Sequence, residues 1–210
     1  MAIDLESDPD RAADLCRAAY QRLVETTAGL TDHQSASPSR LPTWSVGHVL
    51  THLARNADGH SRRLHGALLG KDVPKYEGGG EQRSQEINEG AGRPAAEVLA
   101  DLEASQRRLE DLFSESSAAG WPNTLMLGHT RYGPRGCPAH RLREIEMHHV
   151  DLGLGYEPAN WSERYVAWDL DVLLSTVSER LGDPLHRRDL MAWLAGRAPL
   201  PSELTLDPWG

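Results

Sequence analysis

The stretch Arg143-Glu144-Ile145-Glu146-Met147-His148-His149-Val150-Asp151 is the part of this chain from which the fold and the site are predicted. Glu144 and His148 stand four residues apart. In a helix this spacing places two side chains over each other on one face. A carboxylate and an imidazole on a shared face are a pair that zinc uses in proteins.

A second stretch, Trp44-Ser45-Val46-Gly47-His48-Val49-Leu50-Thr51-His52-Leu53, contains His48 and His52 at the same spacing. His52 lies about 60° from Val49 around a helix, which places it at the edge of the apolar face. One histidine from this stretch, added to the Glu-His pair of the first, makes a His2Glu set. That is the ligand count of a catalytic zinc site, in which three protein groups leave one position open.

Four long amphipathic helices are expected to hold these two stretches face to face. Apolar residues recur at helical spacing in residues 8–30, 45–69, 94–113 and 139–155. Such helices form a bundle, a fold that builds metal sites from facing helices. We therefore predict a mainly α protein, with an up-down four-helix bundle at residues 1–155 and a small, shortened C-terminal α(+β) domain at residues 156–210.

The connections carry weaker signals. Residues 31–42 are rich in Ser, Thr and Pro and predict a loop, whereas residues 81–90 predict a short helix. Leu125 and Leu127 alternate with other residues between glycines, which favours a short strand or hairpin within residues 121–138. Further helices are expected at residues 161–181 and 189–195.

The composition limits the class of protein. Of the 210 residues, 39% are hydrophobic and 25% are charged, which is typical of a soluble globular chain. No apolar run approaches the roughly 20 residues of a membrane span, and the acidic N-terminus does not resemble a signal peptide. A net charge of −9 argues against a nucleic-acid partner. Two cysteines without a CxxC motif predict free thiols in a reducing cytoplasm.

Long motifs, in the order in which a known family has them, extend the argument beyond spacing. Residues 41–57, from Leu41-Pro42-Thr43-Trp44 to Ala54-Arg55-Asn56-Ala57, resemble the first signature of the mycothiol-dependent maleylpyruvate isomerase family, within the DinB-like bundles. Residues 143–153 resemble its second signature, and residues 83–94 resemble the segment between the two. Ala192-Trp193-Leu194-Ala195-Gly196-Arg197 resembles its C-terminal signature, so the resemblance touches most of the chain.

The resemblance implies a divalent metal, usually zinc, with mycothiol as thiol cosubstrate. Carried over residue by residue, the ligands would be His52, Glu144 and His148, and the functional arginine would be Arg197. A thiol bound to a divalent metal is deprotonated and becomes a ready nucleophile. The implied reaction is addition of this thiolate to the cis double bond of maleylpyruvate, rotation, and loss of the thiol to give fumarylpyruvate.

This chain departs from the family's pattern after Gly155. The segment there is short, and the strand-forming stretch expected between the last two helices is nearly absent. Substrate recognition in the family depends partly on that domain. The departure therefore concerns the substrate more than the metal.

Several neighbouring residues have two interpretations. His48 could replace His52 as ligand. We favour the interpretation that His48 lies at the start of the helix and that its ring has its hydrogen bonds satisfied there. Asn56 could form a hydrogen bond that orients one of the metal-ligating residues, or it could be only a polar residue at the edge of the helix face. Tyr76 and Arg83 could line the cleft or belong to a solvated loop, the interpretation we favour.

Two further residues near the motifs also remain open. Arg197, just past Gly196, could bind a substrate carboxylate or an enolate, or only interact with the end of a helix. His149 points about 100° away from His148 and is expected to be a buried, hydrogen-bonded residue.

The sequence leaves four functions open, one of which is a bundle with a vestigial site and only a binding role. The first is a metal-dependent, mycothiol-using isomerase, whose partners are a small electrophilic substrate and a low-molecular-weight thiol. The alternative is a mycothiol S-transferase acting on another electrophile, in detoxification or natural-product metabolism. The least favoured is a non-catalytic zinc-binding regulator, because such proteins rely on cysteine ligands near a histidine. For any of these we expect a monomer or a homodimer.

Overall fold

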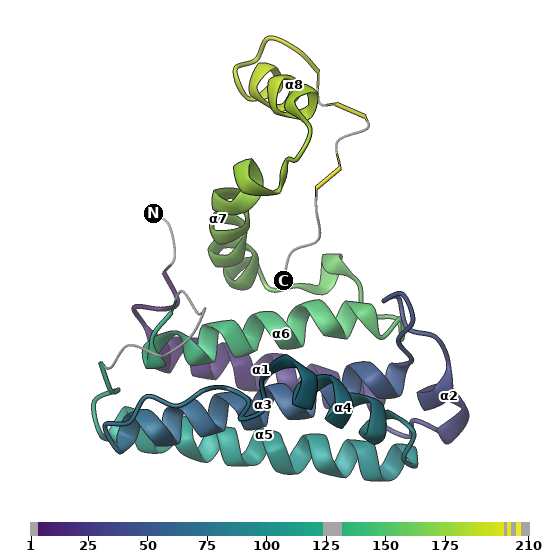
Figure 1. The fold of residues 1–210 in the computed structure, drawn as a ribbon, viewed down its shortest axis with the longest axis vertical. Helices are drawn as coiled ribbons and strands as arrows, with labels where there is room; N and C mark the ends of the chain where they lie inside the picture. Colours follow the sequence, from purple (N-terminus) through teal and green to yellow (C-terminus); the bar gives the residue numbers. More distant parts are fainter. Residues whose placement is uncertain (1–3, 124–131, 200, 203–204, 207–210) are drawn as a thin grey trace. The chain divides into compact units, whose positions relative to one another are not determined.

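The computed structural model in Figure 1 describes residues 4–123, 132–199, 201–202 and 205–206. The chain separates into two compact units, Asp4–Tyr165 and Val166–Gly210, and each is described by itself. The first unit contains four long helices: α1 (Pro9–Thr27), α3 (Val46–Leu68), α5 (Ala95–Ala118) and α6 (Cys137–Asp151). Between them lie shorter helices: α2 (Asp32–Ala36), α4 (Gly79–Ala91) and the 3-10 turns η1 (Pro134–Gly136) and η2 (Pro158–Asn160).

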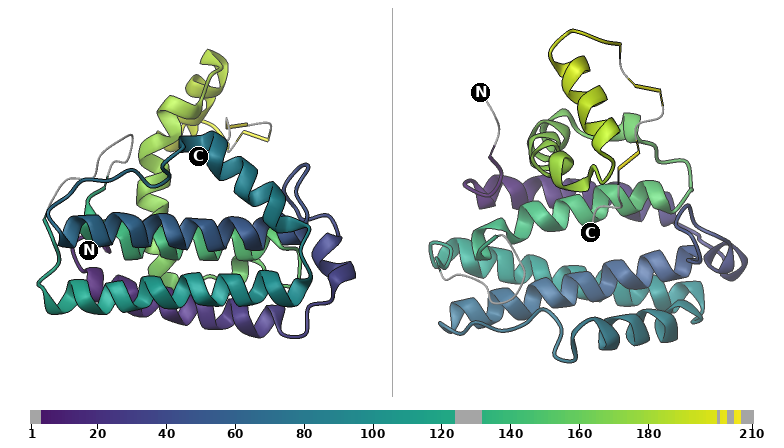
Figure 2. Two further views of the ribbon diagram at one scale, coloured as in Figure 1. Left: turned by 60° about the horizontal axis from the view of Figure 1, so that its bottom comes forward. Right: turned by 45° about the horizontal axis from the view of Figure 1, so that its top comes forward.

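The four long helices pack around one core. Helix α3 contacts α5 and α6, and α1 contacts α6 and α5, as the views in Figure 2 show. Helices α1 and α6 run in one direction and α3 and α5 in the other (Figure 1), because α4 lies along α3 and carries the chain back. The predicted fold class, a mainly α four-helix bundle, is confirmed, but the expected up-down order is not kept throughout, because the consecutive long helices α3 and α5 are parallel.

Local sequence explains where the main helices begin. Asp8 accepts a hydrogen bond from the backbone N–H of Arg11, and Pro9 occupies the first turn of α1, where its missing N–H costs nothing. Helix α3 begins at the predicted cap, Ser45, whose side chain and that of His48 form a reciprocal capping box. The inner faces of α3 and α6 supply fully buried apolar residues, among them Leu50, Leu53, Leu64, Leu142 and Ile145.

Three predictions about elements were wrong. Residues 32–36 form helix α2 instead of a loop, because Thr31 and Gln34 make a capping box that stabilises this five-residue helix. Helix α6 begins at Cys137 instead of residue 139, since a proline in the first turn is compatible with a helix. Helix α8 begins at Pro184 for the same reason, five residues before the predicted start.

The predicted hairpin falls largely outside the described residues. Leu125 and Leu127 lie in the part of the chain that is not described. The described flanks, residues 121–123 and 132–138, contain the turn η1 and no strand.

The end of the first unit is attached to α6. The hydroxyl of Tyr156 donates to Oε2 of Glu146 at 2.5 Å, and Nε1 of Trp161 donates to the Glu146 carbonyl at 3.1 Å. These contacts explain why the compact unit extends to Tyr165. The domain boundary after residue 155 stays a prediction.

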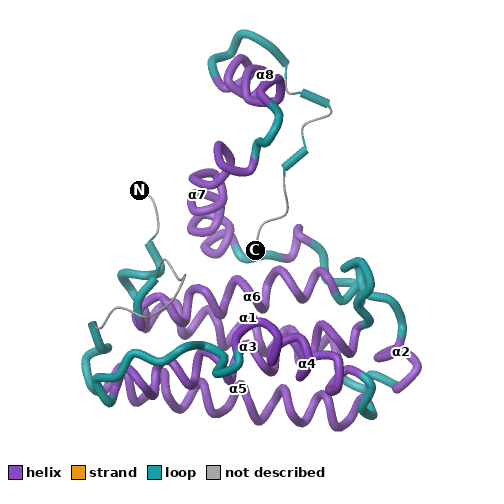
Figure 3. The backbone as a smooth tube through the Cα atoms, in the orientation of Figure 1, coloured by secondary structure: helices purple, strands orange, loops and turns teal. Residues whose placement is uncertain are grey.

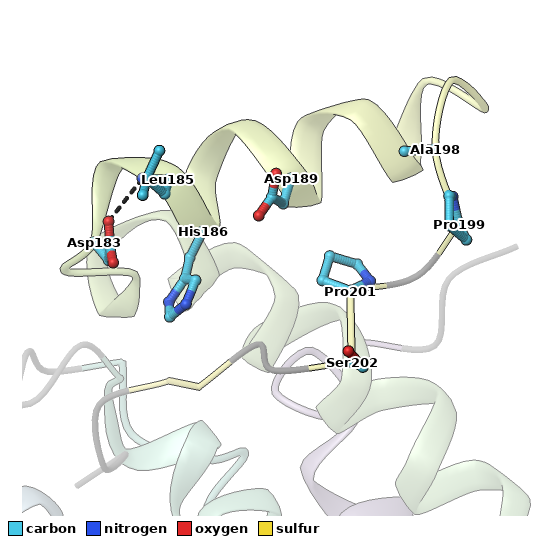
Figure 4. Close-up of a pocket in the computed structure, with 8 residues that line it drawn as sticks. All are labelled: Asp183, Leu185, His186, Asp189, Ala198, Pro199, Pro201 and Ser202. Carbon is cyan, nitrogen blue, oxygen red and sulfur yellow. Dashed lines mark hydrogen bonds between the residues drawn. The ribbon is translucent and has the colours of Figure 1, made fainter.

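The second unit contains the C-terminal part of α7 (Glu163–Arg180) and all of α8 (Pro184–Leu194). Its described residues form helices and loops without a strand (Figure 3). A hollow of about 480 Å³ lies between α8 and the tail, as Figure 4 shows, and is lined by Asp183, Leu185, His186, Asp189, Ala198, Pro199, Pro201 and Ser202. Across the described residues, no helix is both long and apolar enough to cross a membrane.

Candidate metal centre

The pairing of α3 with α6 brings three of the predicted residues together. Nε2 of His52 lies 2.9 Å from Oε2 of Glu144, and Nε2 of His148 lies 3.5 Å from the same oxygen. The two imidazole rings meet edge to face, with centroids 4.6 Å apart. One ligand atom from each residue can be chosen so that all three lie within 4.8 Å of one another, and among the described residues no other such group is found.

These donors fit a divalent ion. Zinc holds imidazole nitrogens and carboxylate oxygens at about 2.0–2.2 Å, so ligand atoms around a tetrahedral ion are roughly 3.3 Å apart. The observed spacing differs from this by amounts that small side-chain rotations can supply. The side chain of His52 is only 4% exposed, but those of Glu144 and His148 are 29% and 21% exposed. The group therefore has one open side, as a site with a free coordination position requires.

Burial and hydrogen bonding set the charges of the three side chains. Burial lowers the pKa of His52 to about 4, so its imidazole is neutral at pH 7. Burial alone would raise the pKa of Glu144, but hydrogen bonds with both histidines outweigh it and hold this pKa well below its usual range. Burial likewise opposes a charge on His148, yet hydrogen bonds with Asp151 and Glu144 raise its pKa to about 9. Without an ion the cluster therefore contains an imidazolium–carboxylate pair, and a metal must displace that proton.

His148 is held from behind by a carboxylate. Its Nδ1 lies 2.8 Å from Oδ2 of Asp151, three residues further along α6. A carboxylate on the outer nitrogen of a ligating histidine fixes the ring orientation and raises the basicity of the inner nitrogen. This role of Asp151 was not predicted, although its spacing of three residues from His148 in the first motif indicates a shared helix face.

Two of the loosely predicted residues, Arg83 and Tyr76, lie at the centre. Nη2 of Arg83, on α4, donates to Nδ1 of His52 at 2.9 Å. Burial raises the pKa of the Tyr76 hydroxyl, from the connection before α4, and the nearby charge of Arg83 acts in the opposite direction. Both residues therefore belong to the surroundings of His52 and not to a solvated loop.

Trp44 covers His52 from another side and was not predicted as a site residue. Its ring centroid lies 5.7 Å from that of His52. Trp44 is the last residue of a tight turn, in which its backbone N–H donates to the Leu41 carbonyl at 3.2 Å. Thr43 in this turn has φ +68°, a left-handed conformation that a β-branched residue rarely adopts. Such strain is found where surrounding structure holds a functional residue in place.

His48 and Asn56 lie outside the ligand group. Nδ1 of His48 accepts from the backbone N–H of Ser45 at 3.2 Å, within the capping box of α3. Asn56 is buried one turn beyond His52, and its Oδ1 accepts from Nη1 of Arg141 at 3.0 Å. Neither side chain makes a described hydrogen bond to a member of the cluster.

Arg197 belongs to the second unit. Its side chain is exposed, and Nη1 donates to the Ala195 carbonyl at 3.1 Å, at the end of α8. This is the helix-end contact that the sequence left open as one interpretation. A functional role for Arg197 stays a prediction.

Further along α3, His60 is buried beside a lysine, whereas His52 is buried beside a carboxylate. This histidine is fully buried, and its Nε2 lies 3.5 Å from Nζ of Lys75. The lysine stem packs over Gly59, where an added Cβ would lie 2.5 Å from its Cγ. Burial lowers the pKa of Lys75 to about 8, with the charge of Glu144 acting in the opposite direction. The ammonium group and the buried Arg141 therefore place positive charge beside Glu144.

The first unit is therefore a four-helix bundle in which side chains from two facing helices meet at one site. Residues 16–153 match the family model described as the mycothiol maleylpyruvate isomerase N-terminal domain. The match covers more than half of the chain, so this protein belongs to that family, as the motifs predicted.

Comparison with solved structures agrees with this assignment. The crystal structure of the mycothiol-dependent maleylpyruvate isomerase is similar with a TM-score of 0.71 and 23% identity, covering 78% of this chain and 69% of that one. A mutant of that enzyme gives the same TM-score and coverage at 22% identity. At this level of identity the likeness shows a shared fold. No curated protein matches this chain.

Proposed function

We propose that this protein is a metal-dependent, mycothiol-using enzyme in which a thiolate adds to an electrophilic double bond. The reaction we favour is the cis-trans isomerisation of maleylpyruvate to fumarylpyruvate. The observation that supports this most is the convergence of His52, Glu144 and His148 around one open position, in a chain of this family.

The three side chains would hold the ion, and Asp151 would keep the His148 ring in the ligating orientation. When bound, a divalent ion supplies the positive charge that keeps a thiol deprotonated at neutral pH, whereas a free thiol has a pKa of about 8.5. We propose zinc because two imidazoles and one carboxylate are a donor set that it commonly takes.

The surroundings also suit an anionic substrate. Maleylpyruvate carries two carboxylates, and negative charge moves onto its carbonyl oxygen when sulfur adds to the double bond. Two positive groups are near the cluster, because Arg83 donates to His52 and the charge of Glu144 acts on Lys75. Positive charge fixed in place before the reaction stabilises an enolate more than water does.

The steps balance without an oxidant. A carbon–sulfur bond forms at one alkene carbon, and the π electrons move to the carbonyl oxygen as an enolate. The carbon–carbon bond is now single and rotates; the enolate then collapses, the carbon–sulfur bond breaks and the thiolate leaves. Arg197 is our proposed partner for the enolate or a carboxylate, because a guanidinium binds such groups through two parallel hydrogen bonds.

We propose that the larger part of the thiol binds beside Trp44. A hollow of about 510 Å³ is lined by residues 36–45, apart from Ser37, and by His48. Trp44 lies both on this hollow and against the ring of His52. A thiol seated there would reach the open side of the cluster past the ring of Trp44.

The alternative is an S-transferase that uses the same first step on another electrophile and omits the elimination. Its support is the short segment after Gly155, in which the strand-forming stretch expected for the family is nearly absent. A zinc-binding regulator has less support, since Cys16 and Cys137 are both buried and neither belongs to the ligand group. We also propose a cytoplasmic location, where free thiols persist.

Purified protein incubated with maleylpyruvate and mycothiol tests the proposal. We expect consumption of the cis isomer that requires both the thiol and the ion, and a large fall in kcat with unchanged ion content for Arg197→Met. Consumption of another electrophile with no isomerisation would select the transferase. An ion content near zero in freshly purified protein that excess zinc does not restore would contradict both.

A further inference from the structure

Arg83 binds the nitrogen of His52 that faces away from the cluster. An arginine guanidinium can only donate hydrogen bonds, so Nδ1 of His52 must act as the acceptor in the 2.9 Å contact. A neutral imidazole carries a single proton, which is then on Nε2, 2.9 Å from Oε2 of Glu144. The two contacts of His52 are therefore consistent with each other and define one tautomer.

That tautomer cannot bind a metal through Nε2. A ligating imidazole gives its Nε2 lone pair to the ion and carries its proton on Nδ1, where it donates to an acceptor. An N–H on Nδ1 cannot accept from Arg83, and the two positive groups would also repel each other. The Arg83–His52 hydrogen bond and an ion on Nε2 thus exclude each other.

We propose that Arg83 competes with the metal ion for His52 and, when the ion binds, is released to bind a carboxylate of the substrate. This second role rests on the proposed function. Within the described residues no ion pair between Arg83 and a carboxylate is found, and the charge of Arg83 acts on the nearby Tyr76 hydroxyl. A guanidinium detached from His52 but still next to Tyr76 would remain beside the open side of the cluster. Loading the site with metal would then also prepare it for an anionic substrate.

The first test measures zinc affinity without any substrate, by competition with a chromophoric chelator. Arg83→Met should bind zinc about tenfold more tightly than wild type, the size expected when a hydrogen bond to a charged group no longer has to be broken. The matched control is Arg62→Met, which removes the same charge from an exposed position on α3 where it pairs with Glu77. Equal or weaker zinc binding by Arg83→Met, or the same gain in Arg62→Met, would overturn the competition.

A second measurement uses wild-type protein and does not depend on a variant that folds. Nitrogen-15 NMR of the imidazoles distinguishes the two tautomers. We expect the proton of His52 on Nε2 before zinc is added and on Nδ1 afterwards. A proton that is on Nδ1 already in the metal-free protein would contradict the proposal.

The released guanidinium is tested with maleate, a simple dicarboxylate, on zinc-loaded protein by calorimetry. Wild type should bind maleate about tenfold more tightly than Arg83→Met, because a charge-assisted pair is lost in the variant. Equal binding would remove the second role and leave the competition intact. If zinc binds neither protein, the proposed function fails; if it binds both with equal affinity, only this inference fails.

Discussion

Two histidines of helix α3, His52 and His60, show how one pair of helices builds two different environments. Both are buried, and burial lowers the pKa of each imidazole. His52 faces the carboxylate of Glu144 in a cluster with an open side, whereas His60 faces the ammonium group of Lys75. The ring of His60 is also stacked on Tyr132, with centroids 6.2 Å apart.

The difference shows what makes a buried histidine a candidate ligand. Neutral imidazole is the ligating form in both positions, so its protonation state does not distinguish them. A cation is attracted to His52 because a carboxylate lies within 2.9 Å, and it would be repelled from His60 by Lys75. Chemical neighbours, more than burial, therefore separate a metal site from a structural histidine.

The largest expected effect comes from removing the carboxylate that distinguishes the two positions. Glu144→Ala and His52→Ala should each lose an ion that wild type contains at about one per chain, because two remaining ligands hold zinc poorly. His60→Leu is the matched control and should keep the ion. Elemental analysis of the freshly purified proteins measures this. An ion retained in either ligand variant, or lost in the control, would remove the distinction between the two histidines.

A smaller effect on zinc binding is expected from removing the charge of Asp151, the carboxylate that contacts His148. Asp151→Asn should weaken zinc binding about 10- to 100-fold, the usual range for the outer partner of a ligating histidine. Asp14→Asn is the control, since Asp14 is an exposed aspartate that pairs with Arg17 on α1. Unchanged zinc affinity in Asp151→Asn would show that the 2.8 Å contact does not support the site.

The stability of the protein should depend on pH through His60. Burial and the neighbouring charges of Lys75 and Arg141 hold its pKa well below the usual value, while Glu144 acts in the opposite direction. The unfolded chain therefore binds a proton below about pH 6.5 that the folded chain does not, and stability is lost as the pH falls below that value. This group contributes up to about 1.4 kcal/mol per pH unit.

Chemical denaturation between about pH 6.5 and 5, with a chelator present, measures this slope. His60→Leu should reduce the loss of unfolding free energy with falling pH, while His52 and other buried histidines contribute equally in both proteins. The same slope in variant and wild type would mean that His60 is protonated in the folded state and that its environment is not as described.

The smallest effect is expected at His48, the alternative ligand that the sequence left open. Glutamine also closes a capping box at this position, so His48→Gln should change the unfolding free energy by less than about 0.5 kcal/mol. The ion content should not change, because His48 is bonded to Ser45 and lies outside the cluster. Loss of the ion in this variant would reassign the ligand on α3.

Sequence patterns predicted the long helices and the residues that converge between them, because both depend on spacing within a helix. Ser45 could be recognised as a cap, and the spacing of Glu144 and His148 directly placed them on one face. The same reasoning applied to His148 and Asp151 would have identified the supporting carboxylate. Only the partner across the bundle, His52, required the assumption that two particular helices meet.

Other features could not be read from the sequence. Helix α2 was missed because its capping residues, Thr31 and Gln34, also occur in loops. The position of Lys75 depends on how the connection after α3 folds back over Gly59, which no periodic pattern records. The contact of Arg83 with His52 likewise depends on the path of α4 along α3. The positions of Lys75 and Arg83 are therefore set by the tertiary packing of the segment after α3, whose sequence has only a weak periodic pattern.

The course of α4 has a practical consequence for anyone who wishes to redesign this protein. The connection from Lys71 to Gly92 supplies Lys75, Tyr76 and Arg83 to the centre, while the ligands themselves are on α3 and α6. The entropy of closing a loop grows slowly with its length, so insertions near Gly78 should be tolerated. Exchanging this one segment would vary the walls around the reactive position and leave the scaffold that positions the ligands untouched.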